Sequence, residues 1–130
     1  MKPWEQWTGR AAVHEVSVAL GIVDEVMRIA RQNNARRVLS VRLKIGQLSG
    51  IQSGCLRFAF DAVKLEHPVL SSAEILISEI PLRYRCVECG RDFDAGGRIA
   101  VSCEACGGRD LKVISGEEQH LENVELEIQP

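Results

Sequence analysis

The chain has 130 residues, a formal net charge of −2, and 45% hydrophobic against 26% charged residues. This length suits one ordinary domain with a modest core and a small appendage. The near-neutral charge excludes the strongly basic surface of nucleic-acid or membrane-surface binders, and no apolar run approaches a membrane span. Because residues 1–13 also lack the apolar centre of a signal peptide, we expect a cytoplasmic protein with no nucleic-acid or membrane partner.

The first part of the chain has the periodicity of a helix followed by a strand. Residues 14–33 repeat apolar side chains at steps of three and four, which predicts an amphipathic helix that ends at Asn33-Asn34. Residues 37–46 alternate between apolar and polar side chains, which predicts a strand with one buried face. The residues expected on that face are Leu39, Val41, Leu43 and Ile45.

A second helix and two more strands follow along the chain. Residues 52–66 predict a helix that stops before His67-Pro68, because proline disfavours helical geometry in the residue before it. Its inward residues are expected to be Cys55, Leu56, Ala59, Phe60 and Val63, with Phe58 as a further candidate. Residues 73–80 and residues 119–128 read as strands.

This order of elements predicts an α/β fold with a small mixed sheet of about three strands, two helices and an inserted zinc-ribbon domain. The last strand must rejoin the sheet, since alone it would leave Val124, Leu126 and Ile128 in water. We therefore expect one domain from residues 13–80 and 117–130, with the ribbon at residues 81–116 inserted into it. Residues 1–12 form an N-terminal extension.

Four cysteines lie in two knuckles of identical spacing, Cys86-x-x-Cys89-Gly90 and Cys103-x-x-Cys106-Gly107. Two such knuckles supply the four soft ligands of a closed tetrahedral site, which is typical of structural zinc. Two disulfides in a secreted protein and rubredoxin-type iron are the alternatives, and both are less favoured. The ribbon has few apolar residues, so metal must supply much of its stability, on the order of 10–16 kcal/mol in small zinc peptides.

The rest of the chain shows no catalytic machinery. There is no Gly-x-Ser-x-Gly, phosphate loop or His-Glu-x-x-His motif, so we predict no catalytic residues and no enzymatic activity. His67 and His120 are expected to be solvated, and Cys55 to be a core residue. A zinc-ribbon adaptor for nucleic acid or a transcription complex is the alternative function, although the ribbon carries six basic against five acidic residues. A rubredoxin-like electron carrier is a third possible function.

Four motifs together carry a resemblance to a known family. They are Val13-His14-Glu15-Val16-Ser17-Val18, the turn Ile45-Gly46-Gln47-Leu48-Ser49-Gly50-Ile51, Leu56-Arg57-Phe58-Ala59-Phe60-Asp61, and Gly116-Glu117-Glu118 leading into the last strand. With the doubled knuckle, they make the chain similar to the HypA/HybF family of hydrogenase nickel-insertion proteins, over residues 13–127.

The resemblance implies a nickel metallochaperone that delivers Ni²⁺ to the hydrogenase large subunit and holds a structural Zn²⁺ at Cys86, Cys89, Cys103 and Cys106. It implies a nickel site at His14, with Glu15 contributing its backbone amide or its carboxylate. The implied partners are a GTPase accessory protein, the hydrogenase large subunit and urease maturation proteins. Nitrogen donors from an imidazole and backbone amides suit the tetragonal geometry of Ni²⁺.

The chain departs from the family at its start, because twelve residues that include Trp4 and Trp7 precede Val13. In one explanation, a GTG codon at position 13 is the true start and is translated as methionine. In the other, the extension is native and alters nickel coordination or requires processing. We favour the first, and the coding DNA around codon 13 distinguishes them.

Overall fold

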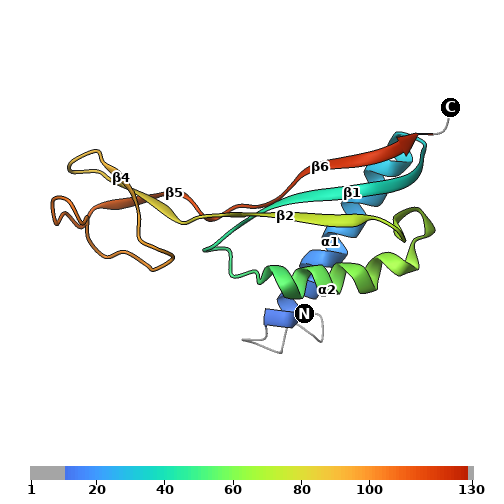
Figure 1. The fold of residues 1–130 in the computed structure, drawn as a ribbon, viewed down its shortest axis with the longest axis horizontal. Helices are drawn as coiled ribbons and strands as arrows, with labels where there is room; N and C mark the ends of the chain where they lie inside the picture. Colours follow the sequence, from blue (N-terminus) through green and yellow to red (C-terminus); the bar gives the residue numbers. More distant parts are fainter. Residues whose placement is uncertain (1–10, 129–130) are drawn as a thin grey trace.

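A computed structural model of the chain describes residues 11–128; the extension with Trp4 and Trp7 lies outside the described residues, apart from its last two positions. The helices and strands follow one another as α1 (Ala11–Gln32), β1 (Ala35–Gly46), α2 (Ser53–Val63), the short 3-10 helices Lys64–Glu66 and Pro68–Leu70, β2 (Glu74–Ile80), β3 (Arg83–Cys86), β4 (Asp92–Asp94), β5 (Leu111–Ser115) and β6 (Gln119–Ile128). Figure 1 shows an elongated molecule, with α1 and α2 beside one sheet and the second sheet at the opposite end.

The first sheet has the strand order β2-β1-β6, with β1 parallel to β2 and antiparallel to β6. A parallel pair needs a crossover connection, which α2 supplies between β1 and β2. The predicted class, an α/β fold with a small mixed sheet and two helices, is confirmed. The last strand rejoins the sheet as expected, and Asn34 ends the α1 segment with a φ of 51°.

The helices bury one face of this sheet in a single core. Its fully buried members come from both helices and from β1 and β2, and include Ala19, Val23, Val26, Val41, Leu43, Leu56, Phe60 and Ile75. The sequence-based choice of Leu39 for this core was wrong. Leu39 is an extra residue in β1 opposite β6, so this bulge reverses the alternation and puts Val38 in the core instead.

Two other expectations for α2 were also wrong. Phe58 is 79% exposed and Cys55 is only half-buried. The buried stripe of α2 consists of Leu56, Ala59 and Phe60. At 100° per residue, Cys55 lies about 90° and Phe58 about 150° from the centre of this stripe, so Cys55 is at its border and Phe58 points away from it.

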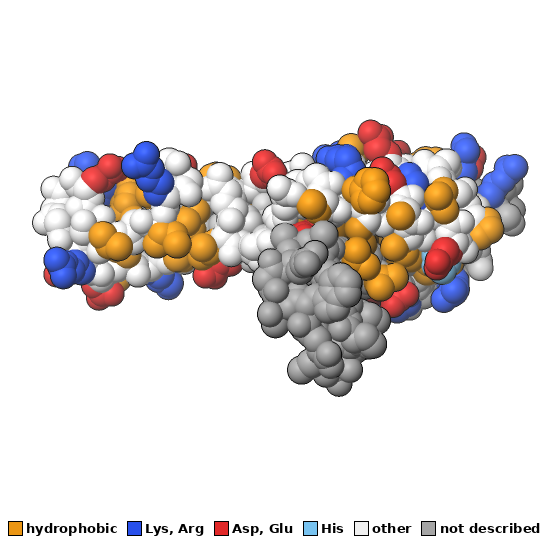
Figure 2. Space-filling model, turned by 90° about the horizontal axis from the view of Figure 1, so that it is seen from below, with side chains coloured by type: hydrophobic (Ala, Val, Ile, Leu, Met, Phe, Trp, Pro, Cys, Tyr) orange, Lys and Arg blue, Asp and Glu red, His pale blue; other side chains and the backbone are white. Residues whose placement is uncertain are grey.

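The second sheet has the order β4-β3-β5 and is antiparallel throughout. Its small core contains Leu82, Tyr84 and Phe93 together with two cysteines, and the Tyr84 and Phe93 rings stack with centroids 5.5 Å apart. Three other apolar residues of this unit are exposed: Val87, Ile99 and Val101. Figure 2 shows hydrophobic side chains gathered on the surface here and over the helices. Such a small core agrees with the expectation that metal must stabilise the ribbon.

The two sheets meet at the end of β1. The Gly46 N–H donates to the Glu118 carbonyl (2.7 Å), and the Gln47 N–H donates to the Ile80 carbonyl (3.0 Å). The Gln47 side-chain oxygen accepts the Leu82 N–H at 2.9 Å. A Cβ atom on Gly46 would lie 2.0 Å from the Gly116 oxygen, so only glycine fits at position 46. The end of β1 is thus bonded to both connections between the sheets.

Candidate metal centres

The four knuckle cysteines converge at the tip of the second sheet. Their Sγ atoms all lie within 4.8 Å of one another, with Cys86 Sγ 3.5 Å from Cys106 Sγ and Cys89 Sγ 3.8 Å from Cys103 Sγ. A tetrahedron with zinc–sulfur bonds of about 2.3 Å has sulfur–sulfur edges of about 3.8 Å. Disulfide sulfurs lie about 2.05 Å apart, so these separations match metal ligation and not disulfides.

Each knuckle is built by the same local hydrogen bond. The Gly90 N–H donates to the Cys86 carbonyl and the Gly107 N–H donates to the Cys103 carbonyl, each at 2.8 Å. Both glycines have a positive φ, 76° and 73°, a backbone conformation that residues with a Cβ rarely adopt. The glycine after each second cysteine therefore allows the turn that aims both sulfurs at one point.

The thiols differ strongly in their acidity. The backbone N–H groups of Cys106 and Ala105 lower the pKa of Cys103 to about 7. The Gly108 N–H acts to lower the pKa of Cys106, but the neighbouring sulfurs, Cys86 foremost, and burial outweigh it and raise that pKa to about 12. Four thiolates this close repel one another unless a cation balances them. The donor set and its spacing suit Zn²⁺, and all four positions come from the protein, which is typical of a structural site.

The residues expected to bind nickel lie at the start of α1. His14 is exposed, whereas Glu15 is completely buried. The Glu15 Oε1 atom accepts the backbone N–H of Gln52 at 2.9 Å, and Gln52 is the residue that precedes α2. Within residues 11–128, the Glu15 Oε2 atom is buried without a hydrogen-bond partner. The carboxylate is therefore held against the start of α2.

No side-chain cluster forms around His14 in the described part of the chain. Within residues 11–128, the four cysteines are the only group of at least three potential ligands close enough to share one metal ion. His120 is exposed as expected, while His67 is half-buried. The Cys55 Sγ atom lies 2.6 Å from the Gln52 side-chain oxygen, to which the thiol donates. The described residues therefore place no further side-chain ligand beside His14.

Sequence reasoning missed two structural contacts near the site, the hydrogen bonds of Gln47 and Gln52. Nothing in the local sequence indicates that the Gln47 side chain accepts a hydrogen bond from Leu82, at the start of the ribbon. Nor does it indicate that the Gln52 N–H donates to the buried Glu15 carboxylate. The burial of Glu15 could have been predicted from the sequence, because Glu15 lies four residues before Ala19, on the same helical stripe as Val23 and Val26.

These features define a class of protein: a small α/β domain joined to a four-cysteine ribbon, with no helix in residues 11–128 long and apolar enough to cross a membrane. Residues 13–126 match the family described as "Hydrogenase/urease nickel incorporation, metallochaperone, hypA". The chain belongs to this family, as its motifs had indicated. The family binds nickel and a structural zinc, and the cysteine cluster suits the zinc.

Individual relatives agree over nearly the whole chain. The hydrogenase maturation factor HypA of Streptomyces avermitilis is 36% identical over 116 residues, covering 88% of both chains. That of Shewanella halifaxensis is 36% identical over 115 residues, covering 88% of this chain and 98% of its own. The solution structure of the Ni metallochaperone HypA from Helicobacter pylori shares the fold, with a TM-score of 0.62 and 23% identity over 88% of this chain and 98% of that one.

Proposed function

We propose that this protein is a non-enzymatic carrier that binds Ni²⁺ through His14 and delivers it to the hydrogenase large subunit. The observation that supports this most is the family match, which begins at Val13 and so includes the His14-Glu15 pair. A surface-exposed imidazole at the end of the domain is accessible to a donor or acceptor of the metal. The absence of a catalytic motif and the names of the relatives, all maturation factors, also favour a carrier.

In this proposal Glu15 contributes its backbone amide, while its carboxylate is structural. The carboxylate is completely buried and accepts the Gln52 N–H, so it faces away from solvent. A helix that begins at Ala11 pairs the Glu15 N–H with the Ala11 carbonyl. Nickel can take this amide nitrogen only if that first turn opens or if translation begins at codon 13. The same start would provide a terminal amine next to His14.

We further propose that Cys86, Cys89, Cys103 and Cys106 hold one structural Zn²⁺. Residues 81–116 then form a ribbon domain inserted into a nickel-binding domain made of residues 13–80 and 117–130. Free cysteines throughout the described residues are typical of a reducing compartment and support a cytoplasmic location. The partners we propose are a GTPase accessory protein, the hydrogenase large subunit and urease maturation proteins.

Isothermal titration with Ni²⁺ tests the carrier proposal. Two forms are compared, the full chain and a chain whose first residues are Met-His-Glu, with methionine in place of Val13. We expect stoichiometric binding to the shorter form and its loss in His14→Ala, while the matched variant His67→Ala binds as before. Nickel binding that is absent from both forms, or unchanged by His14→Ala, would show that the carrier proposal is wrong.

A further inference from the structure

The two edges of the first sheet differ in how their main chain is covered. Beside β2, two side chains cap main-chain carbonyls: Arg57 of α2 donates from Nη1 to the Ile75 carbonyl at 2.7 Å. Lys64, the first residue of the 3-10 helix after α2, donates from Nζ to the Ala73 carbonyl just before β2 at 2.9 Å. At the other edge lies β6, which pairs only with β1 (Figure 1). Within residues 11–128, no side chain hydrogen-bonds to the main chain of β6. An uncapped edge strand is a template for another strand.

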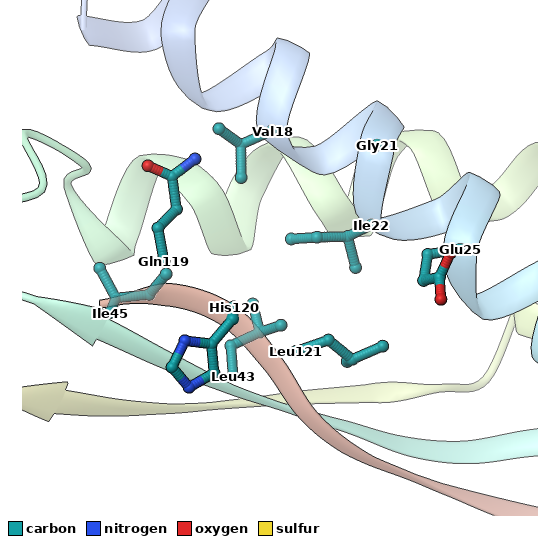
Figure 3. Close-up of a pocket in the computed structure, with 9 residues that line it drawn as sticks. All are labelled: Val18, Gly21, Ile22, Glu25, Leu43, Ile45, Gln119, His120 and Leu121. Carbon is teal, nitrogen blue, oxygen red and sulfur yellow. The ribbon is translucent and has the colours of Figure 1, made fainter. Parts of the chain in front are cut away.

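An apolar groove runs beside this open edge, between α1 and β6. It has a volume of about 300 Å³ and is lined by Val18, Gly21, Ile22, Leu43, Ile45 and Leu121, with Glu25, Gln119 and His120 also on its walls. Figure 3 shows Gln119 and Leu121 of β6 extending toward Val18 and Ile22 of α1 across it. A Cβ atom on Gly21 would meet nothing within 4 Å, so this glycine leaves room in the groove.

The open edge also carries charge of one sign. Residues 117–128 contain five glutamates and no lysine or arginine. Three of these glutamates contact groups on β1: Glu122 lies 3.9 Å from Lys44, Glu125 accepts the Ser40 hydroxyl, and Glu127 pairs with Arg37. Glu117 and Glu118 precede the groove without a basic partner among the described residues. The negative charge that no basic side chain balances thus lies at Glu117 and Glu118, next to the groove, where a basic segment would complement it.

We propose that the edge of β6 and the α1–β6 groove form one docking site for an extended, positively charged peptide segment of a partner protein. The segment adds as a strand beside residues 119–121, so main-chain hydrogen bonds hold it. Alternate side chains of a strand point to the same face, so one apolar side chain enters the groove between Ile22 and Leu121. The bulge at Glu122 bends β6 and limits pairing to the part beside the groove.

The observations favour this occupant over two others. A second copy of the chain would bring an equally acidic strand against β6, and like charges on facing strands are destabilising. A small apolar ligand would leave the strand edge unpaired and make no use of the glutamates. The proposal goes beyond nickel carriage and does not depend on it, because no residue of the groove is a proposed metal ligand.

The test uses a blocked probe peptide of about seven residues that alternates lysine with valine. Chemical shifts of backbone amides in the zinc-loaded full chain are followed by NMR as the peptide is added. We expect shifts confined to residues 117–122 and to the α1 turn around Gly21, with affinity that falls as salt rises. A peptide with glutamate in place of lysine, and one with a central proline, should bind at least about tenfold more weakly.

Variant pairs make the test specific. Gly21→Leu fills the groove and should weaken peptide binding at least about tenfold. Gly54→Leu is the matched control, since Gly54 is also a helical glycine with nothing within 4 Å of an added Cβ, and it should bind normally. Leucine favours helix over glycine, so both variants should fold, which circular dichroism checks. Equal binding of the acidic peptide, binding unchanged by Gly21→Leu, shifts centred on another surface, or dimerisation of the free chain through β6 would each overturn the proposal.

Discussion

Replacing Glu15 by alanine is expected to lower the free energy of unfolding. The size of the change indicates whether the Glu15 Oε2 atom has a hydrogen-bond partner. The variant loses the charge-assisted hydrogen bond to the Gln52 N–H, worth about 1.5–3 kcal/mol, and one buried methylene, worth about 0.8 kcal/mol. The total loss is about 2–4 kcal/mol. The variant also removes the Oε2 atom, whose burial without a hydrogen-bond partner costs the folded state about 1–3 kcal/mol. The net loss of unfolding free energy is therefore about 1 kcal/mol. Urea denaturation followed by circular dichroism measures it.

Glu15→Gln is the companion variant, because its amide oxygen can still accept the Gln52 N–H. If nickel uses the Glu15 backbone amide, Glu15→Gln should keep the nickel affinity of the unsubstituted chain within about threefold. A Glu15→Gln variant that stays as stable but no longer binds nickel would refute this reasoning and make the carboxylate a ligand. A destabilisation of Glu15→Ala well above about 2 kcal/mol would mean that Oε2 has a partner in solution.

Three further expectations concern the ribbon, the metals and the joint. Cys103→Ser should release zinc and unfold the ribbon while leaving most of the helical circular dichroism signal intact. A variant that kept stoichiometric zinc and a protease-resistant ribbon would contradict the four-thiolate site. Stepwise acidification of the nickel- and zinc-loaded protein should release nickel before zinc. Protons compete directly for the His14 imidazole and for backbone amide nitrogens, whereas a closed thiolate site keeps protons off its sulfurs. Metal analysis after dialysis at each pH measures the order, and zinc leaving first would disprove this expectation. Gly46→Ala should cost about 1–3 kcal/mol of unfolding free energy, since its Cβ would lie 2.0 Å from the Gly116 oxygen, whereas Gly54→Ala should not destabilise the chain.

Periodic apolar patterns predicted the regular elements well. The alternation through Val124 and Leu126 placed β6 correctly, because a strand with one buried face leaves a direct record in its sequence. The doubled knuckle likewise predicted that four sulfurs would converge, since that geometry depends on a few adjacent residues.

Features that depend on contacts between distant segments could not be predicted in this way. The Leu39 bulge arises from pairing with β6, far along the chain, so the local alternation gave the wrong residue for the core. The hydrogen bonds of Gln47 and Gln52 join segments separated by more than thirty residues, at separations of 35 and 37. The proposed role of His14 rests on the family resemblance alone, since a histidine near a helix start has no distinctive pattern.

The joint at the end of β1 has a mechanical consequence. The ribbon is attached by two covalent connections, one leaving β2 and the other entering β6. The first bonds to the Gln47 side chain through Leu82, and the second bonds to the Gly46 N–H through Glu118. Because β2 and β6 are the outer strands of the first sheet, any force that displaces the ribbon would pull on both edges of this sheet at once. The segment that follows Gln47 ends at Gln52, whose N–H holds the Glu15 carboxylate.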